Sequence, residues 1–277
     1  MASQEQFPFS QSIVWHPDEE YLGRSRLKRF MDRHGLNTIE ELMERSTTDL
    51  DWFWEATFED LGIEFYEPYS QVVDLSRGIQ WPTWCVDAEL NIVHNCLDKW
   101  IGTPAETRVA LRWEGEGGET RLLTYRDLYQ QVNQVAAGLR AAGLGKGDAI
   151  GLYMPMVPEI VIAFLAIVKI GGVILPLFSG YGPGAVAARL ADANAKALFT
   201  ADGQFRRGRP ILMKPVADEA LADVPSVEKV IVYRRIGQQV PMDAGRDVWW
   251  DDFVAGHPVE APTCLLYTSD AADDHGL

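Results

Sequence analysis

The chain has 277 residues, with 25 Lys and Arg against 40 Asp and Glu, so its formal net charge is −15 at pH 7. A surface with this excess of acid repels phosphate backbones, which excludes nucleic acid as an expected partner. Hydrophobic residues make up 47% and charged residues 23% of the chain, which excludes a disordered or fibrous protein. The length predicts two structural regions or one large domain, and it suffices to bury a real core.

The chain contains three cysteines, Cys85, Cys96 and Cys264. They are too few for a disulfide framework, and their spacing is not that of zinc ligands. The N-terminus lacks the basic start and the apolar run of a signal peptide. We therefore expect a protein of the reducing cytoplasm.

Residues 160–178 (IVIAFLAIVKIGGVILPLF) form the one segment that is long and apolar enough to be considered as a membrane helix. Lys169 lies in its middle, Gly171 and Gly172 interrupt it, and Pro176 follows. The segment divides better into a buried helix and a short buried strand. We expect no membrane partner.

Residues 1–103 carry helix signals and no strand-rich alternation. The stretches TIEELMERS (38–46) and DWFWEATFEDLG (51–62) read as short amphipathic helices, and Gly62 stands where a C-terminal cap is expected. We expect this region to form an N-terminal helical cap.

Strand and helix signals alternate from residue 104 onward. Thr124 and Asp127 have the spacing of a capping box at the start of one helix. Strands are expected at 108–113, 149–153, 173–177, 197–200 and 229–233, and helices at 124–142, 159–170, 183–193 and 215–223. This alternation predicts an α/β fold with a mostly parallel, doubly wound sheet and right-handed crossovers.

No complete catalytic motif is present. The five histidines have no Cys, Asp or Glu partner at ligand spacing, so they predict neither a metal site nor a catalytic base. The glycines at 143, 145 and 147 follow a helix and not a strand, which argues against a nicotinamide-dependent oxidoreductase.

Two segments are candidate anion sites. The run Arg206-Arg207-Gly208-Arg209, with Lys214 nearby, follows a predicted strand, and arginine matches the oxygens of phosphate. The alternative interpretation is a solvated loop whose charges offset nearby acids. The second segment, 178–183 (FSGYGP), is a glycine-rich turn before a helix whose N-terminal amides could face an anion.

Four strings resemble one known family. They are WPTWCVDAELNIVHNCLDKW (81–100), LTYRDL (123–128), GKGDAIGLYMPMVPE (145–159) and FTADGQFRRGR (199–209). Together they resemble acetyl-CoA synthetase and its close relatives, the AMP-forming short-chain acyl-CoA ligases of the adenylate-forming superfamily. In that family a helical N-terminal region precedes a large α/β domain, which agrees with the regions inferred above.

The resemblance implies a two-step reaction on a short-chain carboxylate, ATP with Mg²⁺, and coenzyme A. The acid attacks the α-phosphate of ATP to give an acyl-adenylate and pyrophosphate, and the thiol of coenzyme A then displaces AMP. Arg206 and Arg209 match the arginines that hold the phosphate end of coenzyme A. Phe178, Ser179 and Gly180 match the turn beside its nucleotide. Ser179 stands where acetyl-CoA synthetases usually have glycine, so the acid is left open.

The end of the chain departs from the family pattern. The family continues from Tyr-Thr-Ser into a glycine-rich loop that cradles ATP phosphates, whereas Ser269 here runs into the acidic stretch 270–274 (DAADD). We expect 104–263 to be an incomplete AMP-binding domain and 264–277 to be a truncation or cloning tail. The resemblance then places the ATP and Mg²⁺ sites and any catalytic residue outside this chain, which alone would be inactive. The alternative is a non-catalytic module that binds coenzyme A or an adenine nucleotide, or another protein.

Overall fold

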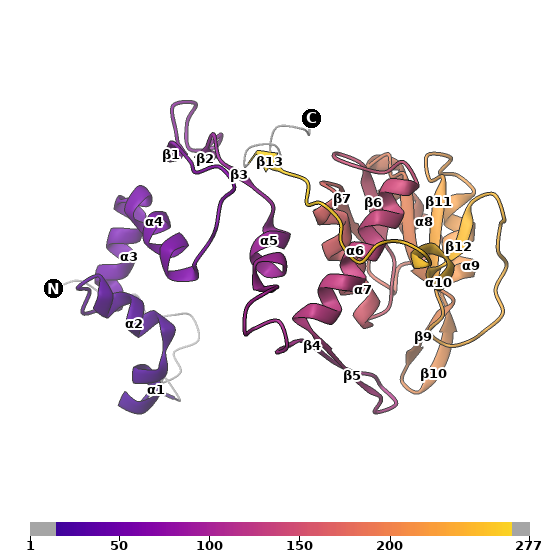
Figure 1. Ribbon diagram of the computed structural model, residues 1–277, viewed down its shortest axis with the longest axis horizontal. Coiled ribbons are helices and arrows are strands. Elements are labelled where there is room, and N and C mark those ends of the chain that lie inside the picture. The colour runs from indigo at the N-terminus through magenta and orange to yellow at the C-terminus, as the bar shows by residue number, and fades with distance from the viewer. Residues whose placement is uncertain (1–14, 268–277) are drawn as a thin grey trace, which may run out of the picture.

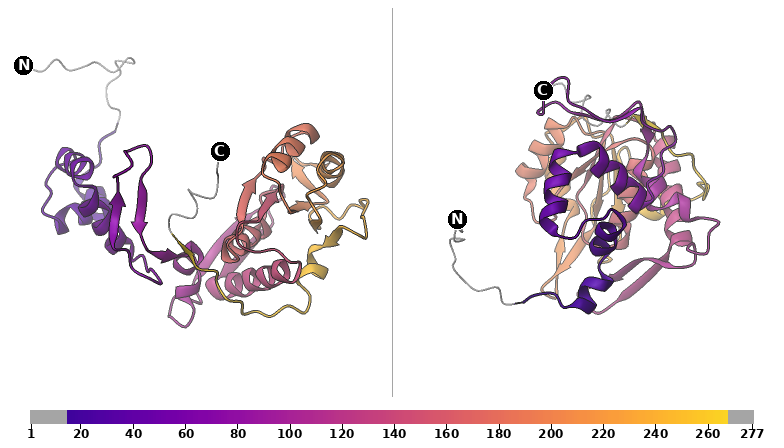
Figure 2. Two further views of the ribbon diagram at one scale, coloured as in Figure 1. Left: turned by 90° about the horizontal axis from the view of Figure 1, so that it is seen from above. Right: turned by 90° about the vertical axis from the view of Figure 1, so that its left-hand side faces the viewer.

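The computed structural model describes residues 15–267 (Figure 1). Helices fill the N-terminal quarter of this range, and a parallel sheet with helices on both faces fills the C-terminal half. Figures 1 and 2 show the first four helices to one side of the sheet, joined to it by a short hairpin and helix α5. The predicted α/β fold preceded by N-terminal helices is confirmed.

The four N-terminal helices each begin at a polar side chain that accepts a hydrogen bond from the backbone of the first turn. They are α1 (Glu19–Arg24), α2 (Arg26–Arg33), α3 (Ile39–Thr48) and α4 (Leu50–Leu61). Helix α4 ends at Gly62, whose φ of 62° is left-handed. Phe30, Met31, Leu42 and Ala56 form part of a small core between these helices. The two helices predicted near 38–46 and 51–62 are therefore present as α3 and α4.

Short strands follow the helices, in a part of the sequence that shows no strand signal. Strands β1 (Gln71–Asp74) and β2 (Thr83–Val86) form an antiparallel hairpin. The next elements are β3 (Glu89–Leu90), helix α5 (Ile92–Cys96) and the 3₁₀ turn η1 (Asp98–Trp100). Four residues give only two alternations of side chain, which is too short a pattern to separate a strand from a loop. The N-terminal helical cap predicted for residues 1–103 therefore also contains short strands.

The sheet has five parallel strands in the order β12-β11-β8-β6-β7. The strands are β6 (Ala149–Leu152), β7 (Val173–Pro176), β8 (Ala197–Ala201), β11 (Lys229–Tyr233) and β12 (Asp247–Trp249). Strands β6 and β8 are buried along their whole length, as expected for central strands of a doubly wound sheet.

Helices cover both faces of the sheet (Figure 1). On one face, side chains of α6 (Tyr125–Ala141), α7 (Pro158–Lys169) and α10 (Trp250–Val254) share a core with Ile150 and Phe199. On the other face, α8 (Pro183–Asp192) and α9 (Lys214–Leu221) pack on Leu198 and Val230. Helix α6 starts with the predicted capping box, in which Thr124 and Asp127 each bond the other's backbone N–H.

The apolar segment 160–178 forms most of α7 and then β7, as predicted. Within residues 15–267, no helix has the length and apolar content that a membrane crossing requires. Lys169 at the end of α7 is buried, and its Nζ lies 2.8 and 2.7 Å from the two carboxylate oxygens of Asp98. This ion pair ties η1 to the sheet region.

Two antiparallel hairpins project from the sheet region. One consists of β4 (Val109–Glu114) and β5 (Thr120–Thr124), and the other of β9 (Gly203–Arg206) and β10 (Arg209–Leu212). The sequence predicted one strand, at 108–113, for the first hairpin and only a charged loop for the second. All four residues of β10 are exposed, so no hydrophobic alternation marks that strand.

The chain remains hydrogen-bonded to the body up to the last described residues. Thr263 Oγ1 donates to Asp98 at 2.7 Å, and Cys264 N donates to the Lys169 carbonyl at 2.8 Å. Strand β13 (Leu266–Tyr267) pairs with β3. The predicted domain boundary at 263/264 stays a prediction, and residues 268–277 of the predicted tail lie outside the described residues.

Candidate functional site

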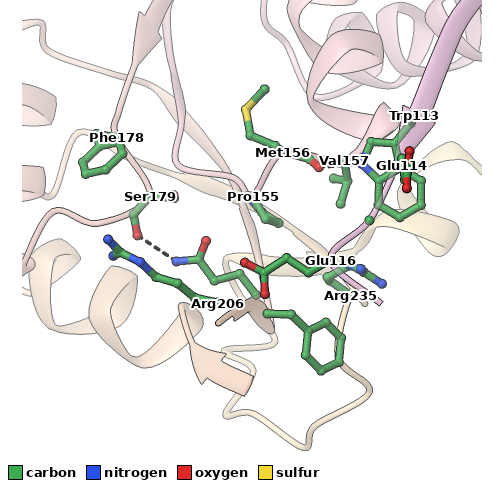
Figure 3. Close-up of a pocket in the computed structure, with 13 residues that line it drawn as sticks. Trp113, Glu114, Glu116, Pro155, Met156, Val157, Phe178, Ser179, Arg206 and Arg235 are labelled. Atoms are coloured by element: carbon green, nitrogen blue, oxygen red, sulfur yellow. Dashed lines mark hydrogen bonds between the residues drawn. The ribbon is translucent and has the colours of Figure 1, made fainter. Parts of the chain in front are cut away.

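A pocket of about 320 Å³ opens at the carboxyl edge of the sheet (Figure 3). Its walls come from the β4–β5 hairpin and from the segments that follow β6, β7, β8 and β11. The lining residues are Trp113, Glu114, Gly115, Glu116, Pro155, Met156, Val157, Phe178, Ser179, Gln204, Phe205, Arg206 and Arg235.

The order of the strands explains this location. The connection through α7 leads from β6 to β7 on one side, and the connection through α8 then crosses back to β8 on the other side of β6. The direction of winding therefore reverses between β6 and β8, which leaves a crevice at their carboxyl ends. Residues 155–157 and 204–206, which line the pocket, directly follow these two strands.

Three of the five predicted site residues line the pocket, namely Phe178, Ser179 and Arg206. The turn after β7 is joined to β9 because Gln204 Nε2 donates to the Ser179 carbonyl at 3.1 Å, the dashed line in Figure 3. Gly180 does not line the pocket, but a Cβ there would lie 2.6 Å from the Phe178 ring. The absence of a side chain at Gly180 therefore leaves room for the Phe178 ring. Arg209 does not line the pocket either.

The arginine run forms the tip of the β9–β10 hairpin. Arg206 and Arg209 are cross-strand partners, so their side chains start side by side. Between them, Arg207 and Gly208 have φ values of 53° and 71°, the left-handed pair of a two-residue hairpin turn. Among residues 15–267, no ion pair involves any of these three arginines. The hairpin thus adds three guanidinium groups beside the pocket.

The turn between β4 and β5 reaches this hairpin tip. The Glu116 carboxylate accepts hydrogen bonds from Arg207 N and Gly208 N, each at 3.1 Å. Next to it, the Glu119 carboxylate lies 3.3 Å from the guanidinium of Arg235. No local sequence pattern predicts this contact, because 91 residues separate Glu116 from Arg207.

A buried carboxylate holds the far side of the pocket in place. Asp202 is fully buried at the end of β8, and it accepts hydrogen bonds from the backbone N–H groups of Gly203, Arg235, Ile236 and Gln238 at 2.7–3.1 Å. It therefore joins the start of β9 to the segment after β11. The Arg235 guanidinium extends from that segment to within 5.2 Å of the centre of the Trp113 ring.

Replacing Asp202 by asparagine is expected to lower the free energy of unfolding by about 2–3 kcal/mol, because the amide nitrogen cannot accept the bonds that one carboxylate oxygen receives. Urea unfolding followed by circular dichroism measures this loss. Asp192→Asn, at an exposed position on α8, is the matched control and is expected to change stability by no more than about 0.5 kcal/mol. Equal effects of the two changes would contradict the bracing role of Asp202.

A second cavity, of about 440 Å³, lies beside the carboxyl end of β11. Arg121 and Glu159 form an ion pair of 2.6 Å in its wall. Burial, together with the nearby Glu159 charge, raises the pKa of Tyr233 to about 12. The Tyr233 hydroxyl therefore remains protonated at neutral pH. Within residues 15–267, no three His, Cys, Asp or Glu side chains are grouped as metal ligands.

A model of the AMP-binding enzyme family matches residues 97–269, more than half of the chain. The chain belongs to this family. The preceding residues 39–96 match a second family model, the acetyl-coenzyme A synthetase N-terminus. The resemblance stated from the sequence is confirmed at this level.

Relatives of this chain include synthetases named for different acids. Acetyl-coenzyme A synthetase of Methanothrix thermoacetophila is 37% identical over 251 residues, which cover 87% of this chain and 38% of the relative. The 3-hydroxypropionyl-coenzyme A synthetase of Sulfurisphaera tokodaii is 38% identical over 90% of this chain and 39% of its own length. Acetyl-coenzyme A synthetase of Mycobacterium tuberculosis is 41% identical over 84% of this chain and 37% of its own length.

The fold is also that of a solved structure. Acetoacetyl-CoA synthetase from Streptomyces lividans superposes with a TM-score of 0.83 at 27% identity, over 92% of this chain and 40% of that structure. The chain thus spans about two fifths of the length of these relatives.

Proposed function

We propose that the protein carrying this chain is an AMP-forming ligase that joins a short-chain carboxylate to coenzyme A. The observation that carries the proposal is the pocket at the β6–β8 reversal in a member of the AMP-binding enzyme family. The Arg206–Arg209 hairpin borders this pocket, and its arginines form no ion pair within residues 15–267. Of the three relatives named above, two are named for acetate and one for 3-hydroxypropionate, at 37–41% identity to this chain. We therefore propose a short-chain carboxylate as the substrate class and do not single out acetate.

The chemistry proceeds in two steps. A carboxylate is a poor acyl donor, so it first attacks the α-phosphate of ATP, which forms an acyl-adenylate and releases pyrophosphate. The sulfur of coenzyme A then attacks the acyl carbon, and AMP leaves. Mg²⁺ would neutralise phosphate charge during the first step. Residues 15–267 offer no grouped metal ligands, so we assign no residue to the ion.

This chain's part in the reaction is to bind coenzyme A. Arg206 and Arg209 would form charge-assisted hydrogen bonds with its phosphates, because guanidinium groups match phosphate oxygens in shape and charge. Phe178, Ser179 and Gly180 would lie beside its nucleotide, where the exposed Phe178 ring offers a stacking surface. The fit to an anion is supported by the hairpin itself, since two arginines opposite each other repel unless an anion joins them. Cys85, Cys96 and Cys264 form no disulfide within residues 15–267, which accords with the cytoplasmic location that we propose.

Substrate-dependent exchange between ATP and radiolabelled pyrophosphate tests the proposal. We expect exchange with at least one of acetate, propionate, 3-hydroxypropionate and acetoacetate, when the product of the whole reading frame that encodes this chain is assayed. The 277-residue chain alone is the control and is expected to give none, because it spans only about two fifths of its relatives. No exchange with any short-chain acid, in a preparation that still binds coenzyme A, would favour the non-catalytic binding module instead.

A further inference from the structure

The tip of the β9–β10 hairpin is already bound to an anion that belongs to the chain. Both oxygens of the Glu116 carboxylate are used, one by Arg207 N and the other by Gly208 N, each at 3.1 Å. Adjacent N–H groups that converge in a left-handed turn form a concave cradle of the kind that binds phosphate groups. The structure therefore reveals an anion site at the tip, with Glu116 as its occupant.

Glu116 lies where it would compete with any anionic ligand of the pocket. Glu116 and Arg206 both line the pocket, and in Figure 3 the Glu116 carboxylate lies between Arg206 and Arg235. A phosphate that approaches Arg206 and Arg209 would meet the negative charge of Glu116 and would compete with it for the same two amides. The contact is solvent-exposed, so it is weak enough to be broken by a ligand that brings more charge.

The turn that carries Glu116 has an anchor of its own. Glycines stand on both sides of Glu116, at 115 and 117, and a Cβ at either position would meet the Glu119 carboxylate at 2.5 or 2.9 Å. Glu119 in turn accepts from Gly117 N at 3.1 Å and pairs with Arg235. The turn can therefore stay attached through Glu119 while the Glu116 side chain leaves the hairpin tip.

We propose that Glu116 is a latch that occupies the phosphate cradle of the hairpin tip and must be displaced when a phosphate group of coenzyme A binds. This inference rests on the proposed function, because it takes coenzyme A as the ligand of the Arg206–Arg209 hairpin. Coenzyme A can use the cradle only in those molecules in which Glu116 has left it. The apparent affinity is therefore the intrinsic affinity multiplied by the fraction of molecules with a free cradle. It also favours ligands with a multiply charged phosphate over singly charged anions, because only the former gain enough from the two amides and the arginines to replace a carboxylate.

Calorimetric titration of the 277-residue chain tests the latch. We expect Glu116→Gln and Glu116→Ala to bind coenzyme A about three- to tenfold more tightly than the unchanged chain, because the cradle is then free. Glu114→Gln is the matched control: it removes the same charge from the same rim, and no hydrogen bond or ion pair of its side chain is found among residues 15–267. Its effect is expected to stay below about twofold. Pantetheine, which has no phosphate, should respond to none of these changes.

Hydrogen exchange gives a second readout that does not depend on affinity. In the free chain, Glu116→Ala should speed amide exchange of a peptide covering 205–209, and coenzyme A should restore the protection that Glu116 gave. Equal or weaker binding of coenzyme A by the Glu116 variants would overturn the latch and leave Glu116 as a static brace of the hairpin. The proposed function is tested separately by Arg206→Gln, which should weaken binding about tenfold. If neither the unchanged chain nor any Glu116 variant bound coenzyme A, the latch and the assignment of the coenzyme A site to this hairpin would both be wrong, whereas the ligase activity is tested by the exchange assay.

Discussion

Replacing Asp98 by alanine is expected to lower the free energy of unfolding by about 3–5 kcal/mol at pH 7, because it leaves a buried ammonium group without its countercharge. The Lys169 side chain is 1% exposed, and both oxygens of Asp98 lie within 2.8 Å of its Nζ. The same carboxylate accepts a hydrogen bond from Thr263. Its loss therefore loosens η1 and the chain before β13 together. Urea unfolding at several pH values measures the cost.

The pH dependence follows from the pKa of Lys169. Burial lowers this pKa below the ordinary lysine value, and the charge of Arg140 adds to the effect, while the hydrogen bond and charge of Asp98 act against it. Without Asp98 the pKa falls further. At pH values between this lowered pKa and the ordinary lysine pKa of about 10.4, the unfolded chain binds more protons than the folded chain. The free energy of unfolding therefore rises with pH in this range. The deficit of Asp98→Ala is thus expected to shrink as the pH is raised from 7 toward 10.

Two further variants distinguish the loss of the Lys169 countercharge from a general loss of packing. The double change Asp98→Ala with Lys169→Met should be more stable than Asp98→Ala alone, because no buried charge then lacks a partner. Glu20→Ala breaks an exposed ion pair, 3.7 Å with Arg24, and should cost less than about 1 kcal/mol. An Asp98→Ala deficit that is the same at every pH would show that Lys169 is not the group responsible.

The sheet and its helices could be predicted from the sequence because their signals are local. Strands β8 and β11 are short apolar runs bounded by turns, and α6 carries both a capping box and an apolar face. The β9–β10 hairpin could not be predicted, since it is exposed, charged and without hydrophobic alternation. Local patterns fix a strand only where one face is buried.

The candidate site could be predicted only in part, for the same reason. Phe178, Ser179 and Arg206 follow strands, so the rule that ligands bind at the carboxyl ends of strands placed them at one edge. Glu116 and Asp202 act through backbone groups far away in the sequence, which no local pattern reports. The fold had to be known before Glu116 could be seen at the hairpin tip.

Changing Arg206 and Arg209 together to glutamine is expected to weaken coenzyme A binding about 100-fold, if these arginines bind its phosphates as we propose. Hydrogen bonds to charged groups contribute about 1.5–3 kcal/mol each, and the exposed position of both side chains favours the lower figure. The residual binding should also depend less on salt than that of the unchanged chain. Calorimetric titration at two salt concentrations measures both effects.

The same double change should leave the fold intact and make the hairpin slightly more stable. Arg206 and Arg209 are direct cross-strand partners, and like charges in such positions repel by a few tenths of a kcal/mol. Arg207→Gln, in the turn between them, is the matched control and should change affinity by no more than about twofold. If the double variant binds coenzyme A more weakly but has a higher free energy of unfolding, the arginine pair serves ligand binding and not the stability of the hairpin. Unchanged affinity in the double variant would instead support the solvated-loop interpretation of this hairpin.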